Sequence, residues 1–288
     1  MAKTKKKTGK LRLLIQCAFA AISNGHLIGF GTGKIYTGPL KTLCHPGLNC
    51  YSCPGALGSC PMGALQAVLG SKEYHIALYV FGLLTVMGSL FGRLICGFLC
   101  PFGLVQDLLH KIPFPKKLRR LPGEKLLRGL RYGVLGILVL LLPMTVSNFM
   151  GLGDPWFCKY LCPAGTLEAG IPLVLLQKDL QSAVGPLYFW KLGVLAVILM
   201  ASVILYRPFC RYLCPLGAIY GFFNRFALYR YTVDPVKCIG CGECQRACEL
   251  DIPVWKRPNG TDCIRCGKCK SACPTGALQS SFSRSSKE

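Results

Sequence analysis

Charged side chains are scarce in this sequence, and acidic ones are the scarcest. Only 16% of the residues are charged, with 12 Asp and Glu against 34 Lys and Arg, while 52% are hydrophobic. Soluble proteins usually have about 25% charged residues, so this composition excludes an ordinary soluble domain and indicates a membrane protein.

Other signals are missing as well. No small-residue cleavage site follows the apolar run after the basic residues 1–10, so we predict no cleaved signal peptide. The chain has no haem-attachment motif Cys-x-x-Cys-His and no flavin-attachment motif. The net charge of +22 would suit nucleic-acid binding, but the basic residues are distributed by membrane side, and we reject that function.

Cysteine, by contrast, is abundant, with 19 in the chain. Residues 238–248 and 263–273 share the spacing Cys-x-x-Cys-x-x-Cys-x-x-x-Cys. This is the bacterial ferredoxin pattern written twice, in which three cysteines hold one 4Fe–4S cluster and the fourth binds the neighbouring cluster. We therefore predict one cluster on Cys238, Cys241, Cys244 and Cys273, and a second on Cys263, Cys266, Cys269 and Cys248.

Zinc is the alternative ligand for these runs, because paired Cys-x-x-Cys also suits zinc. Zinc patterns stop at four ligands, however, and need no third cysteine at the same spacing, so the runs favour iron–sulfur clusters. Glu249 follows Cys248 where ferredoxins usually have proline, a difference that removes no ligand. A domain with these thiolates belongs in a reducing compartment.

Four apolar stretches approach the roughly 20 residues needed to span a bilayer, at 11–30, 74–92, 129–148 and 187–206. Lys and Arg number six up to Arg12, nine in 93–131 and thirteen from Arg207 onward, but three in 31–73 and two in 151–186. Because cytoplasmic loops carry the basic excess, four spans with both termini cytoplasmic satisfy every loop. The shorter apolar pieces 163–176 and 215–229 are predicted to be interfacial or re-entrant helices.

The phrase Cys-Pro-x-Gly recurs five times, beginning at Cys60, Cys100, Cys162, Cys214 and Cys273. Proline favours the first position of a helix, so each cysteine is predicted at or beside a helix N-cap. There the exposed N–H groups and the helix dipole stabilise a thiolate or an anionic cluster. Outside the ferredoxin runs, three of the phrases extend to Cys-x-x-x-Cys-Pro, at Cys96/Cys100, Cys158/Cys162 and Cys210/Cys214.

The four predicted spans divide into two halves of the same orientation, which indicates a parallel repeat about an axis along the membrane normal. Each half places one cysteine pair after its second span, Cys96/Cys100 in the first and Cys210/Cys214 in the second. A pair supplies two of the four ligands that a cubane needs. We therefore predict that the two pairs meet and bind one inner 4Fe–4S cluster.

On the outer side the second half offers Cys158 and Cys162, and the first half offers Cys44, Cys50, Cys53 and Cys60. We predict an outer cluster on Cys158, Cys162, Cys60 and Cys53, with Cys50 as the rival to Cys53 and Cys44 as the weakest candidate. Disulfides are the alternative, because an even set of cysteines facing an oxidising exterior is a common disulfide framework. A mixture of the two is also open.

These motifs resemble a family of four-helix membrane polyferredoxins with Cys-x-x-x-Cys-Pro motifs and a double 4Fe–4S C-terminus. The family includes NapH-type quinol dehydrogenase subunits of periplasmic nitrate reduction, the electron-supply protein of nitrous oxide reduction and the copper-reducing assembly protein CcoG. The resemblance runs from the first span to Pro274 and includes both inner pairs and all eight ferredoxin cysteines. The outer cysteines look like an addition to the NapH-type pattern, which suggests electron transfer across the whole bilayer.

We therefore expect an α-helical integral protein of the cytoplasmic membrane, with four transmembrane helices as two parallel repeats and a C-terminal bacterial 2×4Fe–4S ferredoxin-like domain. The expected divisions are a basic cytoplasmic tail at 1–10, membrane halves at 11–128 and 129–231, and the ferredoxin-like domain with its tail at 232–288.

The expected function is electron transfer, as a subunit of an oxidoreductase, between a soluble ferredoxin or reductase inside and a quinone or extracytoplasmic redox protein outside. A copper-reducing assembly factor and a redox sensor are the alternatives. Asp107 and His110, three residues apart after Cys100, could handle the protons of a quinone or simply face water.

Overall fold

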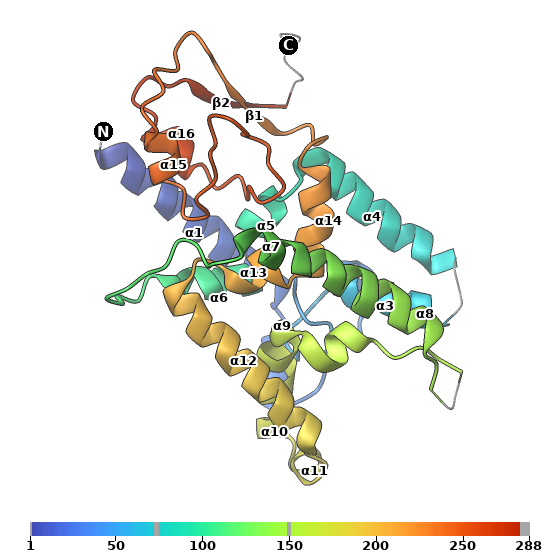
Figure 1. Ribbon diagram of the computed structural model, residues 1–288. Helices are drawn as coiled ribbons and strands as arrows, with labels where there is room; N and C mark the ends of the chain where they lie inside the picture. The colour runs from blue at the N-terminus through green and yellow to red at the C-terminus, as the bar shows by residue number, and fades with distance from the viewer. Residues whose placement is uncertain (1, 72–74, 149–150, 283–288) are drawn as a thin grey trace.

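The computed structural model describes residues 2–71, 75–148 and 151–282, and this part of the chain is mostly helical, with long loops in the C-terminal domain (Figure 1). Met1, Tyr74 and residues 283–288, which belong to the predicted tail, second span and C-terminal domain, lie outside the described residues. In chain order the elements are α1 (Ala2–Ser23), α2 (Leu27–Thr32), the 3-10 helix η1 (Pro39–Thr42), α3 (Pro61–Ser71), α4 (His75–Phe91), α5 (Leu94–Phe98), α6 (Pro101–His110), α7 (Glu124–Gly133), the π-helix η2 (Val134–Leu141), α8 (Leu142–Thr145), the π-helix η3 (Phe157–Leu161), α9 (Pro163–Gly165), the π-helix η4 (Thr166–Gly170), α10 (Ile171–Leu176), α11 (Lys178–Ser182), α12 (Pro186–Ile204), α13 (Pro208–Tyr212), α14 (Pro215–Phe223), β1 (Arg230–Val233), α15 (Glu243–Arg246), α16 (Lys268–Ala272) and β2 (Leu278–Ser281).

Two helices in the described ranges are long and apolar enough to cross a membrane. One is the continuous helix Glu124–Thr145, made of α7, η2 and α8, and the other is α12. Shorter apolar helices run over Leu78–Phe91 and Pro163–Leu176. The first predicted span is interrupted, because α1 ends at Ser23 and the chain turns before α2 begins. By length and composition, therefore, two of the four predicted spans are supported.

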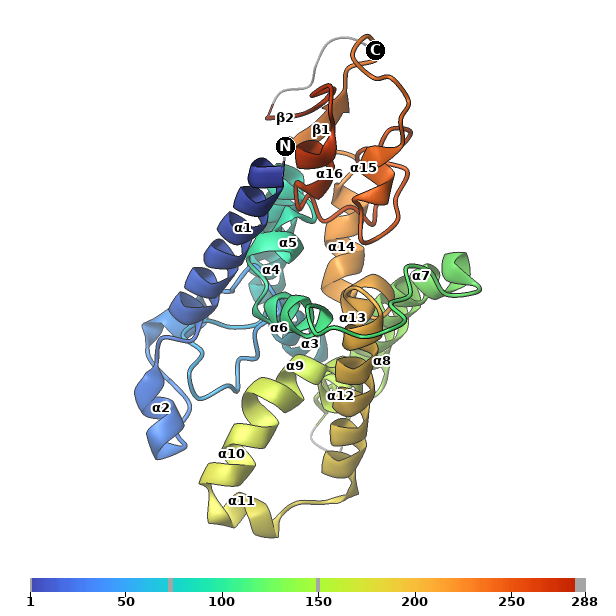
Figure 2. The ribbon, with the colours of Figure 1, turned by 90° about the vertical axis from the view of Figure 1, so that its left-hand side faces the viewer.

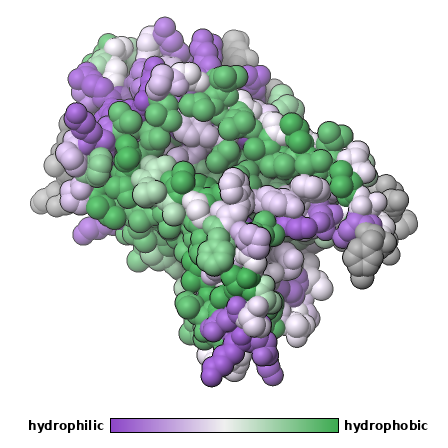
Figure 3. Space-filling view, turned by 60° about the horizontal axis from the view of Figure 1, so that its bottom comes forward, coloured by the Kyte–Doolittle hydropathy of each residue, from purple (hydrophilic) through white to green (hydrophobic). Residues whose placement is uncertain are grey.

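Large apolar side chains cover much of the outer surface. On α12, Phe189, Trp190, Val197 and Met200 are each more than 60% exposed. Figure 3 shows a broad hydrophobic surface bordered by hydrophilic tips. An apolar surface of this extent suits contact with lipid or with another protein.

The C-terminal domain lies at the same end of the molecule as the start of α1, opposite α10 and α11 (Figures 1 and 2). Its strands β1 and β2 pair antiparallel, with Arg230 opposite Ser281 and Val233 opposite Leu278. The helix α1 packs against α16 of this domain and against α6. The helix α1 therefore lies against both the C-terminal domain and α6, which begins after Cys100 of the first inner cysteine pair.

Short helices that begin within two residues of a cysteine meet in the middle of the molecule. The core there contains six buried cysteines: Cys60, Cys96, Cys100, Cys162, Cys210 and Cys214. A second, smaller core in the C-terminal domain contains Cys263 and Cys269 beside Tyr231 and Val254. These eight cysteines thus lie in the two interiors of the protein.

Candidate iron–sulfur sites

Three of the Cys-Pro-x-Gly cysteines cap helices as predicted. Cys100, Cys162 and Cys214 are the N-caps of α6, α9 and α14, and each sulfur accepts a hydrogen bond at 3.4 Å from the backbone N–H of the glycine three residues later. Cys60 directly precedes α3. The prediction is wrong for Cys273, which ends α16, because the chain after it turns and becomes extended to pair with β1.

The two inner pairs meet, although they are far apart in sequence. The sulfur of Cys100 is close enough to interact electrostatically with Cys96 and Cys210, and that of Cys214 interacts with all three. The helices α5 and α6 carry the first pair, and α13 and α14 carry the second. All four side chains are buried. This group of four cysteines is called the inner site below.

A second group forms from Cys50, Cys60, Cys158 and Cys162, and is called the outer site. Cys162 interacts with the other three. The position that a Cβ would occupy at Gly165 lies 3.7 Å from the sulfur of Cys50 and 3.8 Å from that of Cys162. Glycine here therefore leaves open the space between the two sulfurs.

Cys50, and not Cys53, faces the rest of the outer site. The backbone N–H of Cys50 donates a hydrogen bond at 2.7 Å to Oε2 of Glu168, which is held by the same helical segment as Cys162. The thiol of Cys53 instead lies 3.6 Å from Oδ1 of Asn24. Cys44 lies near Cys60. All 19 cysteines fall in the described part of the chain, and each is a free thiol.

The inner and outer sites share a wall of aromatic side chains. Tyr220 interacts with Cys60 of the outer site and with Cys96, Cys100 and Cys214 of the inner site, and its hydroxyl donates to the Pro46 carbonyl at 2.9 Å. The rings that precede Cys158 and Cys210, Phe157 and Phe209, stack with centroids 6.5 Å apart. The two sites are therefore neighbours within one core.

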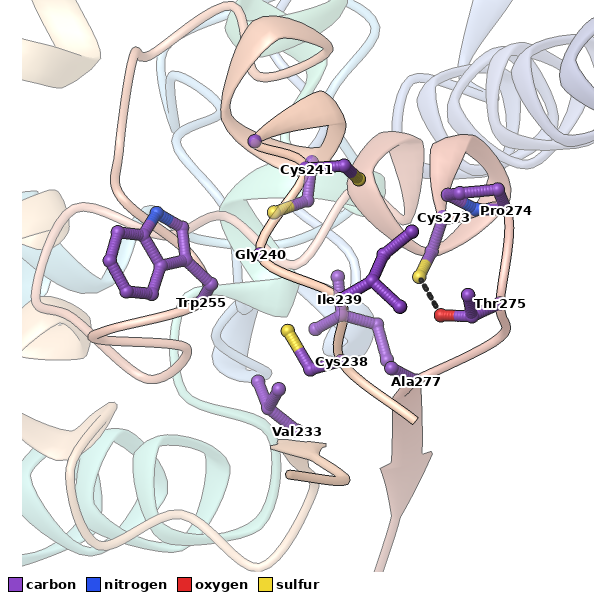
Figure 4. Close-up of a pocket in the computed structure, with 13 residues that line it drawn as sticks. Val233, Cys238, Ile239, Gly240, Cys241, Trp255, Cys273, Pro274, Thr275 and Ala277 are labelled. Atoms are coloured by element: carbon purple, nitrogen blue, oxygen red, sulfur yellow. Dashed lines mark hydrogen bonds between the residues drawn. The ribbon is translucent and has the colours of Figure 1, made fainter. Parts of the chain in front are cut away.

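Two pockets in the C-terminal domain contain the two predicted ferredoxin ligand sets. One is lined by Cys238, Cys241, Cys244 and Cys273, and Figure 4 shows three of these sulfurs around it. The other is lined by Cys248, Cys263, Cys266 and Cys269. Burial raises the pKa of the Cys263 thiol to about 12. Burial also acts to raise the pKa of Cys273, but hydrogen bonds from Thr275 and nearby backbone hold it below its ordinary value.

The donor sets fit clusters better than single metal ions. Across the described ranges, no three Cys, His, Asp or Glu side chains converge as ligands of one ion would. A mononuclear zinc site needs such convergence. A cubane binds each thiolate at a different iron, so the four sulfurs that line each pocket of the C-terminal domain suit it.

The C-terminal domain contacts the inner site through backbone. A Cβ at Gly97, next to Cys96, would lie 2.4 Å from the carbonyl oxygen of Ile264, next to Cys263. Asn224 adds a second link, because its amide donates to the Cys263 carbonyl at 2.7 Å while its Oδ1 accepts from the backbone N–H of Arg93 at 2.9 Å. The second ferredoxin pocket is thus held directly against the inner site.

Several residues around the sites were missed by sequence reasoning. Gln66, Gln106, Glu168 and Tyr220 each stand six residues after the cysteine of a Cys-Pro-x-Gly phrase. Each contacts a cysteine motif or the outer loop: the glutamines bond cysteine sulfurs, Glu168 bonds Cys50 and Tyr220 bonds Pro46. Their common position relative to the repeated phrase was the signal that could have found them.

Family models give four matches along the chain, all described as a 4Fe–4S binding domain. One model matches three times, at 75–122, 132–175 and 186–230, so that each match contains one Cys-x-x-x-Cys-Pro pair. A second model matches residues 258–279, which contain the second ferredoxin run.

Several proteins are similar over much of the chain. An uncharacterised protein of Methanocaldococcus jannaschii is 30% identical over 207 residues, 70% of each chain. The methylamine utilization ferredoxin-type protein MauN of Methylobacillus flagellatus is 31% identical over 196 residues, 65% of this chain and 60% of MauN. The ferredoxin-type protein NapH of Haemophilus influenzae is 30% identical over 164 residues, 57% of this chain and 48% of NapH. No solved structure gives a significant match.

Proposed function

The chain belongs to the 4Fe–4S polyferredoxin family related to NapH-type proteins, and on this basis we propose that it is a membrane-embedded electron-transfer protein. In this proposal it passes electrons between a cytoplasmic ferredoxin-type donor and a quinone or an extracytoplasmic redox partner. Its 4Fe–4S clusters supply reversible one-electron transfer.

The observation that carries the proposal is the unbroken succession of four cysteine groups. The two ferredoxin pockets follow one another in the C-terminal domain. The contact of Ile264 with Gly97 joins the second pocket to the inner site, and Tyr220 joins the inner site to the outer site. Four redox centres held this way would need no long step between neighbours.

In this proposal the polypeptide holds the cysteine thiolates in positions shielded from water and fixes the order of the four cysteine groups. We propose Cys238, Cys241, Cys244 and Cys273 for the first cluster and Cys248, Cys263, Cys266 and Cys269 for the second. Cys96, Cys100, Cys210 and Cys214 would hold the inner cluster. For the outer cluster the contacts favour Cys50, Cys60, Cys158 and Cys162, with Cys50 in place of Cys53.

The first ferredoxin pocket is the proposed contact for a soluble partner. Cys241 is exposed there, and Ile239 beside it is 69% exposed. The cysteines of the second pocket are more enclosed, and Cys263 and Cys269 are buried. A partner that docks on the surface would therefore reach the first cluster before the second.

We propose the two halves 11–128 and 129–231 as the membrane part, with both ends of the chain on the cytoplasmic side. The two span-length helices and the exposed apolar side chains of α12 support a place in the membrane. The basic residues of 93–131 and of the C-terminal part favour the side of the ferredoxin domain as cytoplasmic.

A cavity beside the second ferredoxin pocket suits a quinone head group. It measures about 680 Å³ and lies between α1, α6 and the C-terminal domain, with Cys266, Tyr206, Leu13 and Lys268 among its lining residues. Its mixture of apolar and hydrogen-bonding side chains is typical of small-molecule sites. We propose this cavity as the quinone site, if a quinone is the membrane partner.

His110, which lines this cavity, is the better of the two predicted proton-handling residues. Its Nδ1 is buried, and the Ser202 backbone lies against the ring. Burial lowers the pKa of His110 although Glu249 opposes the change, so the ring is neutral at pH 7 and able to accept a proton. Asp107 is committed to arginine side chains and is not free for this role.

Iron and acid-labile sulfide per chain, measured on protein purified without oxygen, test the proposal. About sixteen of each, with matching reduced-state EPR signals, would support four cubanes. About twelve would leave one site without a cluster, and would favour disulfides or copper at the outer cysteines, as in a copper-reducing assembly factor. About eight would remove both membrane clusters and contradict the proposal.

Transfer across the bilayer is tested in proteoliposomes with the double variant Cys158→Ser/Cys162→Ser. We expect inside-to-outside electron transfer to be lost. Cys17→Ser is the matched control, since Cys17 is exposed on α1 and belongs to none of the four groups. Unchanged transfer in the double variant would contradict a path through the outer site. Tight copper binding there, with respiratory flux unaffected by the variant, would favour the assembly factor instead.

A further inference from the structure

Gln66 and Gln106 make the same pair of contacts at the two membrane sites. Gln106 of α6 donates from Nε2 to the sulfur of Cys210 at 3.1 Å and accepts at Oε1 from the backbone N–H of Phe209 at 3.2 Å. Gln66 of α3 donates to the sulfur of Cys158 at 3.2 Å and to the Met62 carbonyl at 3.0 Å, and it accepts from the N–H of Phe157 at 3.0 Å. Both glutamines are 0% exposed.

The two contacts of each glutamine together determine which way its amide points. The side-chain oxygen accepts and the nitrogen donates. A rotated amide would turn its nitrogen toward a backbone N–H and its oxygen toward a sulfur, so both contacts would become repulsive. The backbone N–H of the residue before the cysteine therefore holds the donor on the sulfur.

The glutamine–sulfur contacts always run from the first half of the repeat to the second half. Both glutamines come from first-half motifs, and both sulfurs belong to second-half motifs. The residues at the same position after Cys162 and Cys214 act elsewhere: Glu168 accepts from the N–H of Cys50, and Tyr220 donates to Pro46. Each membrane site thus has one buried glutamine amide. This amide contacts the first cysteine of the second-half Cys-x-x-x-Cys-Pro pair, Cys158 in the outer site and Cys210 in the inner site.

We propose that Gln66 and Gln106 are matched positioning residues, each of which raises the reduction potential of the single cluster whose cysteine it contacts. This inference rests on the proposed function. Hydrogen bonds to cluster sulfurs are among the factors that set the potential of an iron–sulfur cluster. An N–H directed at a thiolate stabilises its negative charge, and the reduced cluster carries more of that charge.

Potentiometric titration followed by EPR, on the full chain loaded with clusters, tests the inference. Gln106→Met keeps a side chain of similar length and removes the donor. We expect it to lower the midpoint potential of the inner cluster and to leave the outer cluster unchanged. Gln66→Met should do the reverse, so each variant is the control for the other. Signals are assigned to sites by their loss in Cys210→Ser and in Cys158→Ser.

Gln177→Met is a control for the substitution itself. The Gln177 amide donates to the Gly33 carbonyl at 2.7 Å and touches no cysteine sulfur. This variant should leave both potentials unchanged. A purely structural role for Gln106 would reduce the iron content without moving the potential of the clusters that remain, and that result would overturn the inference.

A second measurement uses the unsubstituted protein and does not depend on how the variants fold. With ¹⁵N in the glutamine side-chain amides, pulsed EPR of the reduced chain should detect ¹⁵N coupling at both membrane clusters. Absence of coupling at a loaded cluster would overturn the inference while the proposed function stands. Iron analysis separates the two failures, because membrane sites without iron contradict both.

Discussion

Arg93 and Arg207 reach across the inner site in opposite directions, and each donates a hydrogen bond to the carbonyl of the first cysteine in the other's motif. Arg93 lies three residues before Cys96 and donates to the Cys210 carbonyl at 2.8 Å. Arg207 lies three residues before Cys210 and donates to the Cys96 carbonyl. Both arginines are buried. The exchange ties the two halves of the repeat together at the inner site.

These arginines bring positive charge into the core, and few acids balance it. Arg207 shares Asp107 with Arg12, and Arg93 shares Asp262 with Arg131. Buried charge is costly unless a partner compensates it. A cluster held by four thiolates is anionic, so the unbalanced arginine charge and the cluster would stabilise one another.

Arg93→Gln and Arg207→Gln should each lower the midpoint potential of the inner cluster. A unit charge a few ångströms away is worth about 1–4 kcal/mol at an effective dielectric constant of about 20. For one electron this corresponds to a shift of about 40–170 mV. EPR-monitored titration measures it. Arg230→Gln is the control, because Arg230 lies on β1 and donates to the Arg225 carbonyl instead of to Asp107 or Asp262. Equal potentials in all three variants would contradict the role given to the arginines.

Gly97→Ala should loosen the C-terminal domain from the inner site. The added Cβ would meet the Ile264 carbonyl at 2.4 Å, and both groups belong to backbone that has little room to move. Overpacking of this kind costs about 1–3 kcal/mol. We expect faster amide hydrogen exchange at residues 260–266 and slower electron transfer from the ferredoxin clusters to the inner cluster. Gly129→Ala is the matched control, since no atom lies within 4 Å of its added Cβ.

Cys50→Ser and Cys53→Ser distinguish the two candidates for the outer site. Cys50 lies with Cys162 around Gly165, whereas Cys53 points to Asn24. We expect Cys50→Ser to lose about four irons per chain and the EPR signal of the outer cluster, and Cys53→Ser to keep both. The opposite result would restore the assignment first expected from the sequence.

Asp107→Asn should destabilise the protein by about 3–5 kcal/mol at pH 7, because it leaves Arg12 and Arg207 buried without their partner. Burial alone would raise the pKa of Asp107, but Arg207 and Arg12 hold it well below its ordinary value. The stabilisation is therefore fully present above the ordinary aspartate pKa of about 3.9 and is lost progressively as the pH falls from there through the lower folded value.

Denaturation of this variant and of the parent chain in the same detergent measures the effect. The difference in stability should stay constant from about pH 5 to pH 8 and narrow below about pH 4. A difference that changes between pH 6 and pH 8 would mean that another group titrates in this network.

The division of the eight ferredoxin cysteines between two pockets could be predicted from the sequence because their spacing is local. The meeting of Cys96/Cys100 with Cys210/Cys214 also agrees with the expectation from the repeat. The ligand role of every cysteine stays a prediction.

Other parts of the sites could not be predicted. The position of Cys50 depends on Glu168, 118 residues away, and the ion pairs of Asp107 join residues 95 and 100 positions away. No local pattern marks such partners. The sequence also suggested clusters near opposite faces, whereas the inner and outer groups meet around Tyr220.

The shared wall at Tyr220 bears on how the membrane voltage would act on this protein. Moving one charge across the full bilayer is worth about 2.3 kcal/mol per 100 mV. If the chain spans the membrane as proposed, a step between two sites that both lie near Tyr220 crosses only a small part of that field. The voltage would then act mainly on the exchange of electrons with the partners. Membrane potential should change the rate of that exchange and have little effect on how electrons divide between the inner and outer sites.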